Sequence, residues 1–119
     1  MFGKRLLLVE DDVDTLQALE EWAEHLGCSV RTVRSGDEAL EVARAFKPHI
    51  LITDYLLDGE LTGIDVIVRM REVFSKLTCV LITGVLHEAL RESLHRIHGV
   101  IILAKPVDFD RLCRIVVTA

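Results

Sequence analysis

The chain has 119 residues, of which 50% are hydrophobic, and its formal net charge is −5. A chain of this length can bury one substantial core but not two, so we expect a single domain. The negative charge and the scatter of the basic residues along the sequence argue against a nucleic-acid-binding surface, which would need a basic patch.

Short apolar runs alternate with segments of helical periodicity along the whole chain. The runs are rich in leucine and β-branched residues, a composition typical of strands that are buried on both faces of a sheet. In chain order, we expect strands at Arg5–Val9, Ser29–Val33, His49–Thr53, Thr78–Thr83 and Val100–Leu103.

An amphipathic helix is expected after each strand, because apolar residues recur there at helical spacing. Ser35, with Glu38 three residues later, predicts a capping box at the start of the second helix, and Asp108 is expected to cap the fifth. Gly27 and Pro48 mark the ends of the first two helices. The apolar positions that define the helices are Leu16 to Leu26, Ala39 to Phe46, Ile64 to Phe74, Leu86 to Ile97 and Leu112 to Val116.

This alternation predicts an α/β fold: one doubly wound (βα)5 domain with a central five-stranded parallel sheet and flavodoxin-like topology. We expect residues 1–119 to form this single domain, with no effector domain present. In sheets of this kind, function gathers at the carboxyl ends of the strands, near the point where the strand order reverses. The residues at those ends are therefore the candidates for a functional site.

Acidic residues dominate the predicted strand ends. Glu10, Asp11 and Asp12 follow the first strand, and Asp54 follows the third. Two such charges 4 Å apart repel by about 4 kcal/mol at an effective dielectric constant of about 20, so either water solvates them or a cation binds between them. Carboxylate oxygens suit Mg²⁺, and a carboxylate can also attack phosphorus to give an aspartyl phosphate.

A hydroxyl and an amine are expected at the same edge of the sheet. Thr83 ends the fourth strand, and Lys105 follows the fifth. A lysine in this place would neutralise charge on a transferring phosphoryl group, and a threonine hydroxyl would bind one of its oxygens. The predicted edge therefore carries the groups that phosphoryl transfer to a carboxylate requires.

Four motifs at these strand ends, LLLVEDD, LITDY, LITG and LAKP, resemble in sequence and order the receiver domains of bacterial two-component response regulators. The resemblance covers essentially the whole chain. It implies that Asp54 accepts a phosphoryl group from a histidine kinase or a histidine phosphotransfer domain. It also implies a site for Mg²⁺ (or Mn²⁺) formed by Glu10, Asp11, Asp54 and the main-chain carbonyl of Leu56.

The same resemblance assigns roles at the fourth and fifth strands. Thr83 matches the switch hydroxyl, Lys105 matches the lysine that pairs with the phosphate, and Pro106 matches a lysine–proline step whose peptide bond is usually cis. Ile102 stands where the family often has a large aromatic residue that swings inward when the threonine engages the phosphate. We therefore expect activation to proceed through shifts of the backbone and the fourth helix, or the domain to act mainly as a phosphate relay.

Two other features depart from the common pattern of the family. The loop DYLLDGELTGIDVI has one more residue before Gly63 and is similar to receivers attached to hybrid sensor kinases. Leu56 and Val85 occupy the positions, two residues after the acceptor and two after the switch, that tune the lifetime of the phosphate. Neither side chain can position a hydrolytic water, which predicts slow self-dephosphorylation.

The resemblance thus implies a signalling domain and not an enzyme in the ordinary sense. Its implied partners are a histidine kinase or a histidine phosphotransfer domain, with no direct binding to nucleic acid or membrane. A second copy of the chain is a further implied partner, through the face formed by the predicted fourth helix, fifth strand and fifth helix.

Three alternatives remain open at this stage. Asp12-Val-Asp-Thr faintly resembles the start of haloacid-dehalogenase-like phosphatases, in which Asp12 would be the nucleophile. A flavodoxin-like cofactor module shares the topology, although three consecutive acids would repel the cofactor phosphate. A pseudo-receiver would bind proteins without phosphorylation. In the receiver interpretation, Asp12 and Asp14 only open the first helix, as a cap and a first-turn charge.

The cysteine pattern bears on the cellular compartment. Cys28, Cys79 and Cys113 are odd in number and lack the spacing of a metal site. They fit free thiols in a reducing environment. No apolar run approaches the length of a membrane span, so we expect a cytoplasmic protein.

Overall fold

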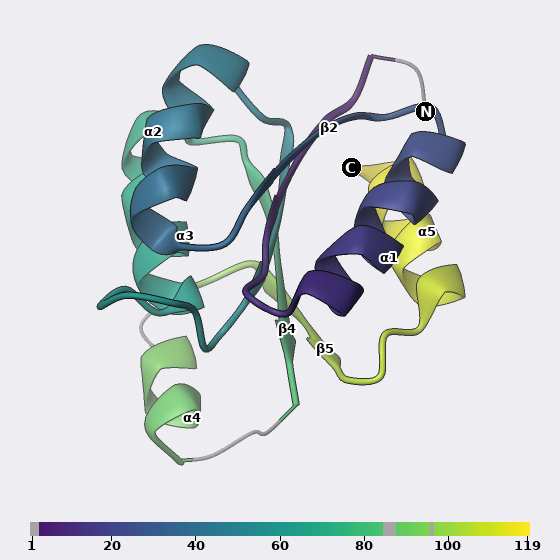
Figure 1. Ribbon diagram of the computed structural model, residues 1–119. Coiled ribbons are helices and arrows are strands. Elements are labelled where there is room, and N and C mark those ends of the chain that lie inside the picture. Colours follow the sequence, from purple (N-terminus) through teal and green to yellow (C-terminus); the bar gives the residue numbers. More distant parts are fainter. Residues whose placement is uncertain (1–2, 85–87, 96) are drawn as a thin grey trace.

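The computed structural model describes residues 3–84, 88–95 and 97–119. Strands and helices alternate strictly along the chain (Figure 1). The elements are β1 (Arg5–Val9), α1 (Val13–His25), β2 (Ser29–Val33), α2 (Gly36–Phe46), β3 (Ile50–Asp54), α3 (Gly63–Val73), β4 (Thr78–Thr83), α4 (Glu88–Leu94), β5 (Val100–Ala104) and α5 (Phe109–Thr118).

The five strands form one parallel sheet in the order β2-β1-β3-β4-β5. Helices α2, α3 and α4 cover one face, and α1 and α5 cover the other (Figure 1). The strand order reverses between β1 and β3, which is where such a sheet offers a crevice at its carboxyl ends. The (βα)5 doubly wound prediction is confirmed.

The two faces of the sheet bury separate sets of side chains, because successive residues of a strand point to opposite sides. On β1, Leu7 and Val9 belong to the core under α2 and α3, whereas Leu6 and Leu8 belong to the core under α1 and α5. All four are at most 1% exposed. Strand β1 therefore needs apolar residues at all four positions from Leu6 to Val9, which explains its unbroken apolar run.

Short polar side chains start the helices. Asp12, Ser35 and Asp108 each accept a hydrogen bond from the main-chain N–H three residues on, as predicted. The reciprocal capping box lies elsewhere than expected: Thr62 and Asp65 form it at the start of α3, whereas at Ser35 only the serine side of the pair is formed. Each such cap stabilises its helix by about 1 kcal/mol.

Three elements have boundaries that differ from the sequence expectation. Strand β3 begins and ends one residue later than predicted, so Asp54 is its last residue and pairs with Ile82 of β4. Strand β5 extends one residue further, to Ala104. Helix α4 ends at Leu94 and not near Ile97, because the chain tightens into a turn there, with the N–H of Ile97 on the carbonyl of Leu94. Leu86, expected in this helix, lies outside the described residues.

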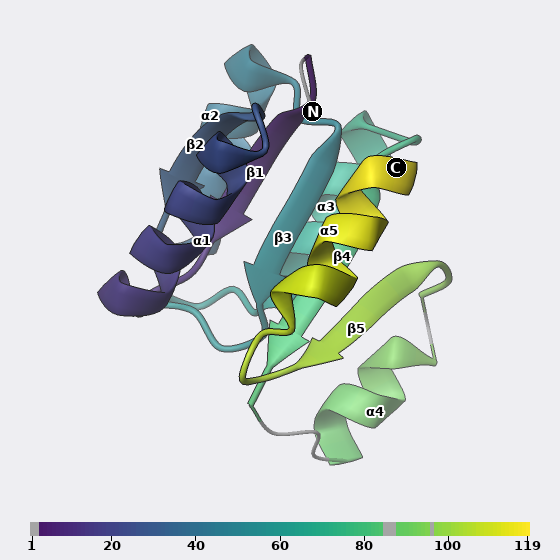
Figure 2. The same ribbon diagram turned by 90° about the vertical axis from the view of Figure 1, so that its right-hand side faces the viewer.

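All strands point the same way, so the sheet has a carboxyl edge and an amino edge, the lower and upper edges in Figure 2. The start of β1 and the end of α5 both lie near the amino edge (Figure 2). Within the described ranges, no helix has the length and apolar character needed to cross a lipid bilayer.

Candidate functional site

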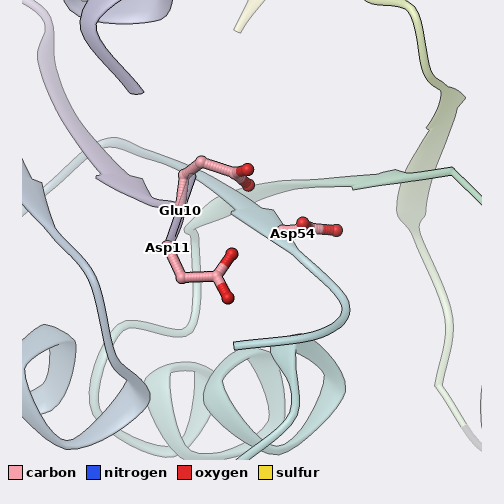
Figure 3. A group of neighbouring side chains, drawn as sticks. All are labelled: Glu10, Asp11 and Asp54. Carbon is pink, nitrogen blue, oxygen red and sulfur yellow. The ribbon is translucent and has the colours of Figure 1, made fainter. Parts of the chain in front are cut away.

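Three carboxylates meet at the carboxyl edge, on either side of the reversal in strand order. Glu10 and Asp11 follow β1, and Asp54 ends the neighbouring strand β3. One oxygen from each lies within 4.8 Å of the others, and the three side chains converge (Figure 3). A hard divalent cation such as Mg²⁺ requires this kind of oxygen cluster. The structure thus brings together the three predicted side-chain metal ligands.

Lys105 places a positive charge between two of these carboxylates. Its Nζ donates hydrogen bonds to Asp54 Oδ2 at 2.9 Å and to Glu10 Oε1 at 3.1 Å. Burial alone would lower the pKa of Lys105, but these two bonds raise it. The lysine therefore stays charged and neutralises part of the cluster, which still carries an excess of negative charge when all three acids are ionised.

Both oxygens of the Asp54 carboxylate are held. The main-chain N–H of Tyr55 donates to Oδ1 at 2.7 Å, and Lys105 holds Oδ2. The residue as a whole is 9% exposed. Since charge-assisted bonds of this kind are strong and directional, the side chain is fixed before any ligand arrives.

Thr83 and Lys105 lie side by side because β4 and β5 are paired in parallel up to Thr83 and Ala104. The main-chain N–H of Lys105 donates to the carbonyl of Thr83 at 2.9 Å. Thr83 is buried and ends its strand one residue beyond Ile82, the partner of Asp54. The peptide bond between Lys105 and Pro106 is cis, which confirms the prediction from the lysine–proline step.

Glu10 is the most buried acid of the cluster, only 3% exposed. Burial and the negative charge of Asp54 raise its pKa to about 7, although the hydrogen bond from Lys105 acts in the opposite direction. A carboxylate with an ordinary pKa is fully ionised at neutral pH. Glu10 therefore ionises less readily than an ordinary carboxyl group.

This shift predicts how stability changes with pH. Between the ordinary carboxyl pKa and about 7, the folded chain binds a proton at Glu10 that the unfolded chain has lost. The free energy of unfolding in EDTA should therefore fall as the pH rises through this range and stay low above it. Glu10→Gln should remove this fall and gain on the order of 2 kcal/mol over wild type at pH 8, measured by urea unfolding.

The exposed acid Glu24 of α1 supplies the control. Glu24→Gln removes one negative charge but should keep the wild-type pH profile. Adding Mg²⁺ should stabilise the wild type and the control more than Glu10→Gln. A Glu10→Gln profile that follows the wild type in EDTA would contradict the burial argument.

Asp12 and Asp14 stand apart from the cluster. Asp12 accepts hydrogen bonds from the Thr15 hydroxyl at 2.5 Å and from its N–H at 3.0 Å, and these bonds lower its pKa. Asp14 is an exposed first-turn residue of α1. Both residues therefore fit the expected role of opening the helix, and Asp12 is poorly placed as the nucleophile of a dehalogenase-like phosphatase.

The β3–α3 loop depends on Gly63. The N–H of Gly63 donates to the carbonyl of Tyr55 at 2.7 Å, which closes the loop against the end of β3. A Cβ atom at position 63 would lie 2.0 Å from the main-chain oxygen of Asp54. Only glycine allows α3 to start this close to the carboxylate-bearing residue.

The sequence predicts that Leu56 and Val85 slow the loss of the phosphoryl group. The side chain of Leu56 is exposed, with 65% of its surface accessible. Val85 lies outside the described residues. The role of the Leu56 carbonyl as a metal ligand stays a prediction.

Arg34 directly follows β2, and from the sequence this strand end was expected to carry no group comparable to those of the site. Its guanidinium donates to the main-chain carbonyl of Asp11 at 3.1 Å and lies 3.9 Å from the carboxylate of Asp58. An isolated bridge also joins Ser35 to Asp58. The arginine thus ties the loop that carries Asp11 to the loop after Asp54, although no motif in the sequence signals these contacts.

The sequence matches known proteins over nearly its whole length. The family model of the response regulator receiver domain matches residues 6–117. The uncharacterized 14.6 kDa protein in the sodA1 3′ region of Leptolyngbya boryana is 31% identical over 93% of this chain and 86% of its own length. The alkaline phosphatase synthesis transcriptional regulatory protein PhoP of Bacillus subtilis is 33% identical over 59% of this chain, which spans only 29% of that regulator.

Solved structures show the same fold. The signal receiver domain of a modulated diguanylate cyclase from Desulfovibrio desulfuricans has a TM-score of 0.88 and 29% identity, over 97% of this chain and 91% of that one. A response regulator receiver domain protein from Clostridium thermocellum has a TM-score of 0.84 and 24% identity, over 97% and 92% of the two chains. With its carboxylate cluster at the strand-order reversal and the family match over residues 6–117, the chain belongs to the response regulator receiver domains.

Proposed function

We propose that this domain accepts a phosphoryl group on Asp54 from a phosphohistidine and passes on the signal by changing conformation or by relaying the phosphate. The observation that carries this proposal is the position of the Asp54 carboxylate. It is held by Tyr55 and Lys105 and lies in one cluster with Glu10 and Asp11.

In the proposed transfer, an oxygen of Asp54 forms a bond to phosphorus, and the bond between phosphorus and the donor imidazole breaks. The electron pair of the broken bond stays with the imidazole. Glu10, Asp11, Asp54 and the carbonyl of Leu56 would hold Mg²⁺, which when bound supplies positive charge to the phosphoryl oxygens. Lys105 would move from a carboxylate to a phosphoryl oxygen, and Thr83 would donate its hydroxyl to another.

The proposed partners follow from this chemistry. A histidine kinase or a histidine phosphotransfer domain supplies the phosphoryl group, and a second copy of the chain can pair through α4, β5 and α5. The proposal places the domain in the cytoplasm and includes no direct contact with nucleic acid. PhoP and a second relative, the transcriptional regulatory protein AfsQ1 of Streptomyces coelicolor, are much longer, since this chain spans only 29% and 34% of their lengths.

Intact-mass spectrometry after incubation with acetyl phosphate and Mg²⁺ tests the function. The wild type should gain one phosphoryl group per chain. Asp54→Asn should gain none, because a neutral amide oxygen is a much weaker nucleophile than a carboxylate oxygen. EDTA should prevent the gain in the wild type. Phosphorylation of Asp54→Asn to the same extent would place the acceptor elsewhere, and a gain unaffected by EDTA would remove the metal from the proposal.

The lifetime of the phosphate is a separate prediction. Leu56→Asn and Val85→Glu, introduced together, place two polar groups where the chain has apolar ones. They should speed the loss of phosphate by about tenfold or more, since a positioned acid–base group accelerates hydrolysis. The decay of the phosphorylated mass peak after removal of acetyl phosphate measures this rate. An unchanged half-life would refute slow self-dephosphorylation by these residues.

A further inference from the structure

A hollow of about 460 Å³ lies at the amino edge of the sheet, at the far end of the strands from the carboxylate cluster. Its walls come from the start of β1, the α2–β3 connection, the end of α3 and the α3–β4 connection. The lining residues that carry the argument are Lys4, Arg5, Lys47, His49, Phe74 and Lys76.

Basic side chains from separate parts of the sequence gather around this amino-edge hollow. Lysines 4, 47 and 76 line it, so three of the four lysines of the chain lie here and the fourth, Lys105, is at the carboxylate cluster. No acidic side chain is among the lining residues, but Ala119 also lines the hollow, and its main-chain oxygen accepts a hydrogen bond from Lys4 Nζ. Lys47 and Lys76 are therefore the lysines that carry the proposal. Within the described part of the chain, none of these lysines forms an ion pair with a carboxylate side chain. Lysines that are far apart in the sequence thus form a local positive patch on a protein whose net charge is negative.

Lys47 occupies an unusual backbone position. It follows α2 in the left-handed region, with φ of 52°, and is the only described residue other than glycine with a positive φ. Glycine is usual at such a helix end because any side chain is strained there. Its main-chain carbonyl accepts a hydrogen bond from Arg5 Nε at 2.8 Å, which orders the two residues together. The chain keeps a lysine where glycine would fold more easily.

His49 adds a neutral donor beside the lysines. Its Nδ1 accepts the main-chain N–H of Arg5 at 2.9 Å. Burial and the charges of Arg5 and Lys4 lower the pKa of His49, which keeps Nδ1 free of a proton. The ring proton is therefore on Nε2. Apolar lining residues (Pro48, Val73, Phe74 and Leu77) complete the hollow.

We propose that the amino-edge hollow binds a small organic anion that carries two or more phosphoryl groups on an apolar body, a nucleoside polyphosphate in chemical class. Its volume lies within the range of pockets that hold ligands of this size. The lysines supply charge for the phosphoryl groups, His49 supplies a hydrogen-bond donor, and the apolar residues around Phe74 provide a surface for the base. This binding is independent of phosphorylation at Asp54.

Titration calorimetry with ATP in EDTA and low salt tests the proposal. EDTA keeps Mg²⁺ from linking ATP to the carboxylate cluster. The wild type should bind one ATP per chain, tripolyphosphate more weakly, and adenosine not measurably. Lys47→Gly and Lys76→Gln should each weaken ATP binding about fivefold, the value expected for one unit charge near a solvated ligand. Lys47→Gly should fold at least as well as the wild type, because glycine relieves the backbone strain.

Arg111→Gln is the matched control, since it removes one positive charge from the exposed start of α5. Arg111→Gln should leave ATP binding unchanged. In the wild type, the backbone amide NMR signals that shift when ATP is added should belong to residues 47–49 and 74–78. Any of four results would overturn the proposal: no saturable ATP binding, equal weakening by Arg111→Gln, shifts centred on Glu10 and Asp11, or tighter binding of a polyglutamate peptide than of ATP. The last result would assign the hollow to an acidic protein segment.

Discussion

Lys105→Gln should slow the phosphorylation of Asp54 about a hundredfold, because a preorganised positive group aimed at developing charge is worth about two to three orders of magnitude in rate. The structure places Lys105 Nζ 2.9 Å from Asp54 Oδ2, so the lysine already contacts the carboxylate that we propose as the phosphoryl acceptor. Glutamine is close in length but carries no charge. The rate of phosphoryl gain with acetyl phosphate, followed by intact mass at saturating Mg²⁺, measures the loss.

Two comparisons make this result specific. Lys105→Arg retains the charge and should recover part of the rate. The recovery should be incomplete, because the planar guanidinium group differs in shape from the compact ammonium group of lysine. Arg111→Gln, which lowers the net charge equally, should phosphorylate at the wild-type rate. If Lys105→Gln reacted as fast as the wild type, the lysine would serve only to hold the metal-free carboxylates together.

Gly63→Ala should destabilise the fold by about 3 kcal/mol or more, at the upper end of the cost of overpacking. The new methyl group would lie 2.0 Å from the main-chain oxygen of Asp54 and 2.9 Å from Leu81 Cδ1. A flexible side chain could move aside, but the oxygen belongs to the last residue of β3 and cannot move without breaking the end of the strand. Urea unfolding in EDTA measures the loss.

Gly84→Ala is the matched control for this substitution. Among the described residues, a Cβ atom at position 84 would meet only Lys105 Cδ, at an ordinary contact distance of 3.9 Å. The variant should therefore unfold within about 0.5 kcal/mol of the wild type, as surface substitutions usually do. A mild effect of Gly63→Ala, similar to that of Gly84→Ala, would mean that α3 can pivot away from β3 at little cost.

Much of the fold could be predicted from the sequence because its signals are local. The range predicted for β1 was correct, since every residue of that strand is apolar or lies at its start and both its faces are buried. The start of α5 was predicted because an aspartate cap acts within three residues of itself. The end of α4 was not, because apolar spacing continues past Leu94 into a turn that still packs Ile97 on the core.

In the candidate site, too, the sequence predicts some contacts and not others. Glu10, Asp11, Asp54 and Lys105 could be predicted together, because parallel strands bring their carboxyl ends to one edge. The contact of Arg34 with Asp11 depends on side-chain geometry across two loops, which no sequence pattern encodes. The amino-edge hollow was missed for a similar reason, since Lys4, Lys47 and Lys76 are far apart in the chain and only the fold brings them together.

The closure of the β3–α3 loop fixes where α3 starts relative to the end of β3. The bond between the Gly63 N–H and the Tyr55 carbonyl fixes both ends of the loop, and the bridge from Ser35 to Asp58 holds its middle. Gly59, with φ of 88°, has open space around it. One more residue in a loop pinned in this way costs only a few tenths of a kcal/mol in closure entropy. A change of one residue in the length of this loop should therefore leave the register of α3 against β3 unchanged.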